Sequence, residues 1–466
     1  MTRAAEYLWI QIRDHVSRFF SKEATTLLES SRIIFASYDQ AMHTRQPAVV
    51  IPIDIPAPVE PNTPYRVPFN GTHLTPWNPL PAPSQGEWQA LPDASAPLWY
   101  RHQAGTITPA WNLFANLFDL LTFREERESQ ARDCHGRFVA RFSPRYREGL
   151  LEVPAFNEGA AALVAACAGL RRNGSPAFDL EDLVGPPVAV LSHDCDILAG
   201  NDIWTQLIRA HRIVQPLKRA RLPRPGNLWW MISNAILPKR FYFDNVTGMI
   251  NLEREFGYTS SFYLLNGSGG RYGARSGSKL LPDLIEAVPE QWDIGMHYNY
   301  DTHLHHERFQ TQLDELNAIV PGGIKCGRAH YFRFDSKKSL PFLESFGIEC
   351  DESAGYSDRI GYRCGIGGCF QPYDAASGKA LNIYEIPAVI MDTTLVDQYG
   401  EKSLARFRYL MNHLGCIGGA LSLIFHPGNF HNPELRRMLG IYHKLLIECR
   451  QLEVQSQTPL ALAISA

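Results

Sequence analysis

The stretch Val188–Asp196 reads VAVLSHDCD: four apolar residues, then a serine, a histidine and two acids separated by a cysteine. Its apolar start predicts a strand, Val188 to Ser192, buried in a sheet. Asp194 and Asp196 are two residues apart, so in extended chain both carboxylates point to one side and can share a water or a cation. The alternation turns Cys195 away from them, and we expect it to be packed. The stretch therefore predicts a buried strand with acidic chemistry at its carboxyl end.

The chain beyond this strand alternates between strand-like and helix-like segments about seven times. The further predicted strands are Ser260 to Leu265, Asp293 to His297, Gly323 to Phe334, Ile348 to Asp351, Tyr384 to Met391 and Leu421 to His426. The predicted helices are Leu304 to Val320, Leu404 to Leu414 and Pro433 to Leu452. This alternation is typical of parallel strands with crossover helices, in a doubly wound sheet or a closed α/β barrel. Both folds place their chemistry at the carboxyl ends of the strands.

Histidines and acids stand at or near the ends of other predicted strands as well, namely His297, His330, Asp351 and His426. Two close carboxylates need a metal or a shared proton to offset their repulsion. Imidazoles from neighbouring strands would complete, with Asp194 and Asp196, a site suited to zinc, iron, cobalt or nickel with positions left open for water. Such a site is catalytic rather than structural in character.

Structural explanations stay open for the same residues. Asp194 could cap a following helix while Asp196 pairs with an arginine, and His297 could be a core imidazole bonded to backbone. We favour a ligand role for His297 and interpret Asp301 as the N-cap of the helix that starts near Thr302. Three histidines at the start of that helix are expected to be a solvated first turn: His303, His305 and His306.

The composition argues against a nucleic-acid-binding protein and against a membrane-spanning one. The 466 residues carry 45 Lys and Arg against 48 Asp and Glu, so no basic excess favours binding to nucleic acid. No apolar run approaches the ~20 residues of a membrane span. Met1 to Glu29 has an amphipathic helix pattern rather than that of a secretion signal, so we expect a cytoplasmic protein. The nine cysteines are scattered, which favours reduced thiols, and Cys364 and Cys369 lack the second pair that a structural zinc site needs.

Residues 1–180 are expected to form an N-terminal α+β domain and residues 181–466 the catalytic domain. Thirteen of the 32 prolines fall between Pro47 and Pro97, where an extended, apolar-rich segment should wrap a surface or add edge strands. Trp111 to Leu121 and Gly159 to Leu170 are predicted helices. The glycine-rich stretch at 267–273 lacks both phosphate-loop and dinucleotide fingerprints and is expected to be a loop over a pocket.

The strand-end motifs resemble those of polysaccharide deacetylases of the NodB-homology type, grouped with carbohydrate esterase family four, and most of all an intracellular bacterial branch. The matching motifs are His-Asp-x-Asp at 193–196, Asp-Ile-Gly-Met-His at 293–297, Gly-Arg-Ala-His-Tyr-Phe-Arg-Phe at 327–334 and Leu-Ile-Phe-His at 423–426. Asp-Cys-His-Gly-Arg-Phe at 133–138 is similar to the amino-terminal domain of that branch. The resemblance implies a distorted (β/α)7 barrel and metal-dependent hydrolysis of an N-acyl group, acetyl or formyl, from an amino sugar.

The resemblance also implies roles for single residues. Asp194 matches the catalytic base, Arg328 the arginine that braces it, and His426 the general acid. Asp196 and His297 match ligands of a divalent metal, zinc or alternatively cobalt, nickel or iron. The third ligand is His330 or Asp301, and we favour His330. The implied substrate contacts are Asp351, Arg363 and Tyr331, the last near the oxyanion.

Cys195 separates two acids that are adjacent in the superfamily, so the roles of Asp194 and Asp196 could be exchanged. Without an export signal, a nucleotide-linked or lipid-linked sugar is the expected substrate, in the synthesis of a surface polysaccharide such as O-antigen or capsule. Two alternatives remain open. One is a metal-free hydrolase of ureides on the same fold, and the other is a non-catalytic carbohydrate-binding protein.

Overall fold

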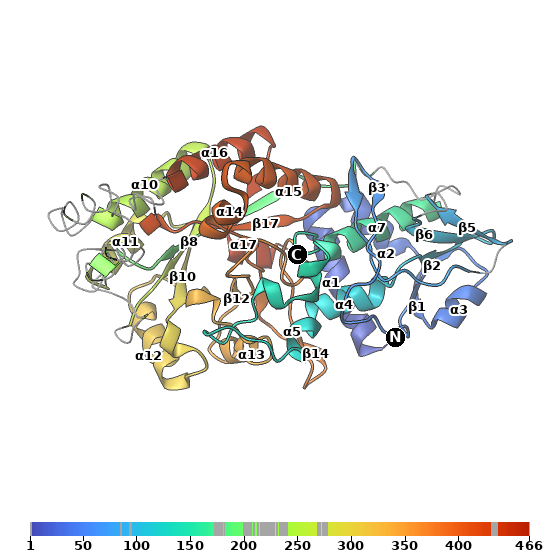
Figure 1. Cartoon of the computed structure of the whole chain (residues 1–466), viewed down its shortest axis with the longest axis horizontal. Coiled ribbons are helices and arrows are strands. Elements are labelled where there is room, and N and C mark those ends of the chain that lie inside the picture. The colour runs from blue at the N-terminus through green and yellow to red at the C-terminus, as the bar shows by residue number, and fades with distance from the viewer. Residues whose placement is uncertain are drawn as a thin grey trace.

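The computed structural model describes residues 2–83, 86–92, 96–171, 180, 182–198, 241–267, 272, 278–429 and 437–465, with isolated residues between 199 and 240. Most of the glycine-rich stretch at 267–273 and the first residues of the helix predicted from Pro433 therefore lie outside the described residues. Figure 1 shows an elongated molecule with the N-terminal elements at one end and the main sheet at the other.

The main sheet is parallel throughout and runs in the order β15-β12-β11-β10-β9-β8-β17-β16. Its strands are β8 (Val188–Cys195), β9 (Ser260–Leu264), β10 (Asp293–Tyr298), β11 (Cys326–Ala329), β12 (Cys350–Asp351), β15 (Tyr384–Glu385), β16 (Ile390–Met391) and β17 (Ala420–Ile424). A further short strand, β18 (Gln455–Ser456), pairs with the start of β8.

The two outer strands of this order, β15 and β16, belong to the single stretch Tyr384–Met391 that the sequence predicts as one strand. Only residues 386–389 separate them, so the two edges of the sheet lie within a few residues of extended chain of each other. The sheet therefore curls round on itself, with seven strand segments once this stretch is taken as one. The predicted distorted (β/α)7 barrel is confirmed.

Helices form most of the crossovers between the parallel strands, whereas the connection from β12 to β15 carries the hairpin of β13 (Tyr373–Asp374) and β14 (Lys379–Ala380) instead. The bounds of the helices are α10 (Phe241–Phe256), α11 (Leu281–Ala287), α12 (His306–Asn317), α13 (Ser339–Glu344), α14 (Asp392–Tyr399), α15 (Ser403–Ile417), α16 (Arg437–Gln451) and α17 (Pro459–Ile464). The predicted helices correspond to α12, α15 and α16. The N-cap of α12 is His305, whose ring accepts a hydrogen bond from the backbone N–H of Arg308 at 3.4 Å. The prediction that Asp301 caps this helix is wrong, because Leu304 at φ 57° interrupts the backbone between them.

The predicted strand Gly323 to Phe334 is much shorter in the structure, where β11 ends at Ala329. A 3₁₀ turn, η5 (His330–Phe332), follows at once. Tyr331 and Phe332 have φ values of 64° and 49°, a left-handed conformation that cannot continue a strand. The strand therefore stops where the candidate site begins.

The N-terminal region combines helices with a mixed five-stranded sheet of order β1-β2-β7-β6-β5. Its strands are β1 (Ile33–Ala36), β2 (Ala48–Pro52), β5 (Trp88–Leu91), β6 (Trp99–His102) and β7 (Thr106–Pro109), with a separate hairpin of β3 (Val67–Phe69) and β4 (Thr72–Leu74). Its helices are α1 (Arg3–Phe19), α2 (Lys22–Ser30), α3 (Tyr38–His43), α4 (Leu113–Leu121), α5 (Arg124–Glu128), α6 (Pro144–Arg147) and α7 (Ala155–Arg171), with the 3₁₀ turn η1 (Ala140–Phe142). The proline-rich segment supplies β2 to β5. The predicted N-terminal helix is two helices, because Ser21 starts a second one with its own side-chain cap.

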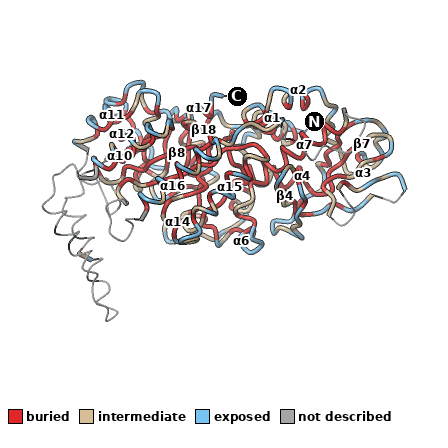
Figure 2. The backbone as a smooth tube through the Cα atoms, turned by 90° about the horizontal axis from the view of Figure 1, so that it is seen from above, coloured by how far each residue is buried: buried red, intermediate tan, exposed pale blue. Residues whose placement is uncertain are grey.

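The N-terminal region and the barrel share one hydrophobic core. A single cluster of buried side chains includes Leu8 and Trp99 of the N-terminal region together with Phe262 of the barrel and Leu462 near the C-terminus. Figure 2 shows buried backbone running through the length of the molecule without an exposed break between the two parts. The N-terminal region is therefore packed against the barrel through this common core.

Two further expectations concern the whole chain. All nine cysteines are free thiols, as predicted. Within the described residues, no helix combines the length and the apolar character that crossing a membrane requires.

Candidate active site

The predicted base, acid and metal ligands meet at one edge of the barrel. Strands β17, β8, β9, β10 and β11 are consecutive neighbours in the sheet, so their carboxyl ends open on the same side. Asp194 lies at the end of β8 and Asp196 just beyond it, His297 lies in β10, Arg328 in β11 with His330 just after it, and His426 follows β17. The structure thus brings these six side chains together at one edge of the sheet.

Asp194 is held by a buried arginine. Arg328 is fully buried and its guanidinium contacts Asp194 Oδ1 at 2.5 Å and Glu352 Oε2 at 2.8 Å. Burial by itself would raise the pKa of Asp194, but the positive charge of Arg328, helped by His297 and His426, holds that pKa below its ordinary value. Asp194 is therefore a carboxylate that stays ionised although it is 6% exposed. The predicted bracing role of Arg328 depends on this contact.

Asp196, His297 and His330 form a group that could hold a metal ion, with one ligand atom from each lying within 4.8 Å of the others. Asp196 Oδ1 is 3.2 Å from His297 Nε2 and 3.7 Å from His330 Nε2. The ring of His297 donates its Nδ1 proton to the carbonyl oxygen of Arg328 at 2.9 Å, which directs Nε2 toward the acid. The geometry places His330 in this group, whereas Asp301 lies 3.5 Å from Arg308 and outside it.

The donor atoms of this group fit a divalent cation. Burial alone would lower the pKa of His297, but the negative charges of Asp194 and Asp196 raise it, so either a proton or a metal cation can lie between its Nε2 and Asp196 Oδ1. Asp196 Oδ1 and His330 Nδ1 are both buried without a hydrogen bond of good geometry. Burial lowers the pKa of His330 to about 4, so this ring is neutral at pH 7, as a metal ligand must be. One carboxylate and two imidazoles suit zinc or a similar borderline metal with open positions.

His426 is paired with an acid that the sequence interpretation missed. Its Nδ1 lies 3.1 Å from Asp392 Oδ1, and its backbone N–H donates to Asp392 Oδ2 at 3.0 Å. Burial alone would lower the pKa of His426, but Asp392, followed by Asp194 and Asp196, raises it to about 10. His426 Nε2 is 3.6 Å from Asp194 Oδ2. Asp392 directly follows the predicted strand Tyr384 to Met391, so the strand-end rule could have found it.

Of the three predicted substrate contacts, one is exposed beside the site and two are buried. Tyr331 is 39% exposed, and its ring centroid lies 4.7 Å from that of His330. Asp351 is fully buried and accepts hydrogen bonds from the backbone and hydroxyl of Ser353. Arg363 is 3% exposed, and its guanidinium contacts Glu126 at 2.5 Å and the carbonyl oxygen of Gly355 at 3.0 Å. In this structure Asp351 and Arg363 are withdrawn from a substrate, because both side chains are buried.

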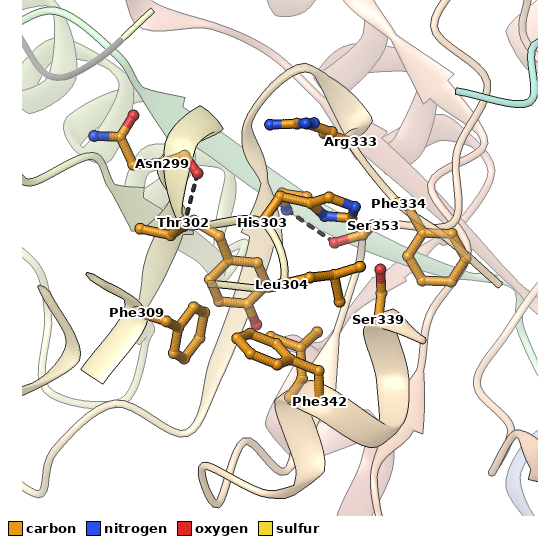
Figure 3. Close-up of a pocket in the computed structure, with 13 residues that line it drawn as sticks. Asn299, Thr302, His303, Leu304, Phe309, Arg333, Phe334, Ser339, Phe342 and Ser353 are labelled. Atoms are coloured by element: carbon orange, nitrogen blue, oxygen red, sulfur yellow. Dashed lines mark hydrogen bonds between the residues drawn. The ribbon is translucent and has the colours of Figure 1, made fainter. Parts of the chain in front are cut away.

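The remaining predicted residues lie outside the site. Cys195 is packed in the core as expected, and burial raises the pKa of its thiol. His305 and His306 are exposed at the start of α12, as predicted, whereas His303 is half-buried and lines a small cavity. Figure 3 shows this cavity, with Leu304, Phe309 and Phe342 among the apolar side chains around it. Tyr298 and Ala329 also line it, and they alternate with His297 and Arg328 along β10 and β11, so the cavity lies behind the catalytic face of the sheet.

Comparisons with known proteins give matches only among solved structures. No family model and no curated protein matches the chain. A putative polysaccharide deacetylase from Mycobacterium smegmatis is 15% identical, with 58% of this chain and 93% of that chain covered and a TM-score of 0.33. A putative polysaccharide deacetylase involved in O-antigen biosynthesis from Bordetella bronchiseptica is 17% identical, with coverages of 47% and 80% and a TM-score of 0.29. PuuE allantoinase is 11% identical, with coverages of 60% and 89% and a TM-score of 0.39.

Two of these structures carry the name of the family that the strand-end motifs resemble. Because the identities are below 20% and the TM-scores below 0.4, the likenesses carry no conclusion about activity. Folds of this kind also host more than one chemistry, so function has to be argued from the side chains of the site.

Proposed function

We propose that this chain is a metal-dependent hydrolase that removes an N-acyl group, acetyl or formyl, from an amino sugar. The observation that carries the proposal is the arrangement around Asp194. This ionised carboxylate lies between a group of three candidate metal ligands on one side and an imidazole with a strongly raised pKa, His426, on the other. Amide hydrolysis needs a base, an acid and an electrophile that converge on one bond.

A divalent metal held by Asp196, His297 and His330 would make water more acidic and polarise the acyl oxygen. The protein's own residues then handle the protons. Asp194, kept ionised by Arg328, takes a proton from the water that attacks the acyl carbon. His426, kept protonated by Asp392, gives a proton to the amine nitrogen as the C–N bond breaks. The products are a carboxylate and a free amine.

The pKa of Asp194 is lowered and that of His426 is raised, which suits a base and an acid respectively. The base has to be deprotonated and the acid protonated at the same pH, and this requires environments that move their pKa values apart. Arg328 does so for Asp194, and Asp392 does so for His426. We assign the base to Asp194 and the ligand to Asp196; the contact of Arg328 with the first and the closer approach of the two ring nitrogens to the second support this assignment.

The substrate proposal extends to a nucleotide-linked or lipid-linked N-acylated sugar used in cytoplasmic synthesis of a surface polysaccharide. This part rests on the expected cytoplasmic location and on the resemblance of the motifs, and on no single residue. A screen for amine release over N-acetyl and N-formyl sugars, free and nucleotide-linked, tests it directly.

The experiment that tests the core of the proposal is metal analysis of protein purified without chelator. We expect about one equivalent of a divalent metal in the wild type, and loss of that metal with amine release in an Asp196→Ala, His297→Ala double variant. Asp301→Ala is the matched control: it removes a nearby acid outside the ligand group and should leave the metal in place. His330→Ala should weaken metal binding.

Two results would contradict the proposal. A folded wild type that takes up neither zinc nor cobalt and still hydrolyses a ureide would favour the metal-free alternative. A metal-loaded wild type that binds sugars but releases no amine from any of them would favour a non-catalytic carbohydrate-binding protein.

A further inference from the structure

Four aromatic side chains from separate parts of the chain form a cluster beside the metal-ligand group: His135, Tyr272, Tyr300 and Tyr331. Within this aromatic cluster every ring centroid lies between 4.6 and 5.8 Å from the other three. His135 comes from the N-terminal region, Tyr300 follows β10, and Tyr331 follows β11. The cluster thus joins the N-terminal region to the catalytic edge of the barrel.

A self-supported turn presents His135 to the cluster. Asp133 Oδ1 accepts hydrogen bonds from the backbone N–H groups of His135 and Arg137, both at 2.9 Å. Asp133 Oδ2 pairs with the Arg137 guanidinium at 2.7 Å, and Gly136 takes the positive φ of 78° that the turn requires. The sequence Asp-Cys-His-Gly-Arg therefore builds a rigid turn with a histidine at its tip.

The same turn supports the backbone that carries a candidate metal ligand. Arg137 donates a hydrogen bond to the carbonyl oxygen of Tyr331 at 2.7 Å. Tyr331 lies in the left-handed region directly after His330, and such backbone persists only where the surroundings hold it. His135 Nδ1 also lies 3.1 Å from the hydroxyl of Tyr300. The turn is placed to affect both the position of His330 and the surface beside it.

We propose that the aromatic cluster is the surface on which a sugar ring of the substrate rests, so that the N-terminal region takes part in substrate recognition. The proposal rests on the proposed function, because it concerns the same site. Tyr331 is 39% exposed, and its ring centroid lies 4.7 Å from that of the candidate ligand His330. Aromatic faces pack well against the C–H face of a pyranose, while the rim of hydroxyl and imidazole groups can bond to its hydroxyls.

Among the residues that the structure describes, the cationic groups beside the cluster are already engaged, which favours a neutral ring. The guanidinium of Arg137 is already paired with Asp133, and that of Arg333 lies over the Tyr300 ring at 4.5 Å while donating to the Tyr300 carbonyl oxygen. We therefore assign the cluster to a sugar ring next to the one that is deacylated. A nucleotide in the same place is a separate outcome of the test.

The test compares two probes on the full chain: N-acetylglucosamine and its β-1,4-linked disaccharide, N,N′-diacetylchitobiose. Binding is measured by calorimetry on an Asp194→Asn background, which blocks turnover, and KM and kcat are measured on the active protein. We expect His135→Ala and Tyr331→Ala to weaken disaccharide binding about fivefold and monosaccharide binding much less. His135→Phe keeps a ring and should restore most of the affinity.

Tyr146→Ala is the matched control, because Tyr146 is 40% exposed and lies in α6, outside the aromatic cluster. Equal losses of disaccharide affinity in His135→Ala and His135→Phe would show that His135 only supports the local structure, and would overturn the proposal. An unchanged KM in variants that still release amine would also overturn it. Weaker binding of uridine monophosphate in place of the disaccharide would assign the cluster to a nucleotide and also overturn it. Ring-dependent disaccharide binding without amine release from any sugar would instead overturn the proposed function and leave this inference in place.

Discussion

Replacing Asp392 by asparagine should lower the pKa of His426, so that this proton donor loses its proton, and the enzyme its activity, at a lower pH than in the wild type. At the 3.1 Å separation of His426 Nδ1 and Asp392 Oδ1, the attraction is at most about 5 kcal/mol at an effective dielectric constant of ~20. Hydrogen bonds between charged groups contribute about 1.5–3 kcal/mol net. Taking about 3 kcal/mol, the variant loses about a hundredfold in the proton affinity of His426.

This loss has a definite sign in a pH profile. His426 in the wild type has a pKa of about 10 and is the proton donor, so activity should fall only as the pH rises through that value. In Asp392→Asn the activity should fall at a pH about two units lower. The ratio of wild-type to variant kcat/KM should therefore grow about tenfold between pH 7 and pH 9.

The assay is amine release from an N-acetylated sugar across that pH range, with metal content as the control. Asp392 is not in the metal-ligand group, so the variant should keep its metal. A ratio that stays constant from pH 7 to pH 9 would refute the reasoning, since it would mean that Asp392 only positions the ring or that His426 is not the donor.

Two other predictions concern folding. Arg328→Met should lower the free energy of unfolding by about 3–5 kcal/mol, because it leaves buried carboxylates unpaired. The control Arg408→Met, on the surface, should lower it by less than about 1 kcal/mol. Urea unfolding of both variants measures the difference. Gly295→Ala should yield little folded protein, because a Cβ there would come within 2.4 Å of the Tyr263 ring and 2.7 Å of the Cys326 carbonyl oxygen; circular dichroism and soluble yield would show it, and a native-like melting curve would contradict it.

The sequence predicts the barrel and the catalytic edge because parallel strands end on one side. Asp194, His297 and His426 were found by that rule alone, without knowledge of which strands are neighbours. The same rule could have found Asp392, but an acid at the start of a helix such as α14 has a common local explanation, and only the fold shows that His426 lies beside it.

The rule is wrong for Asp351, and the reason is local. Asp351 ends β12, but its carboxylate accepts hydrogen bonds from Ser353, two residues later in the chain. Arg363 could not be interpreted from spacing either, because its acidic partner, Glu126, stands 237 residues earlier in the chain. The aromatic cluster has the same origin: His135 and Tyr300 are 165 residues apart, and no local pattern connects them.

The formal charges at the site are consistent with a divalent cation. Four carboxylates, those of Asp194, Asp196, Glu352 and Asp392, are connected through contacts to Arg328 or to the histidines. Against them stand the guanidinium of Arg328 and the imidazolium of His426, which leaves a formal charge of −2 when the candidate ligand histidines are neutral. Unbalanced charge in a buried site is costly. One divalent cation beside Asp196 would bring the site to neutrality while allowing Asp194 to remain a base and His426 to remain an acid.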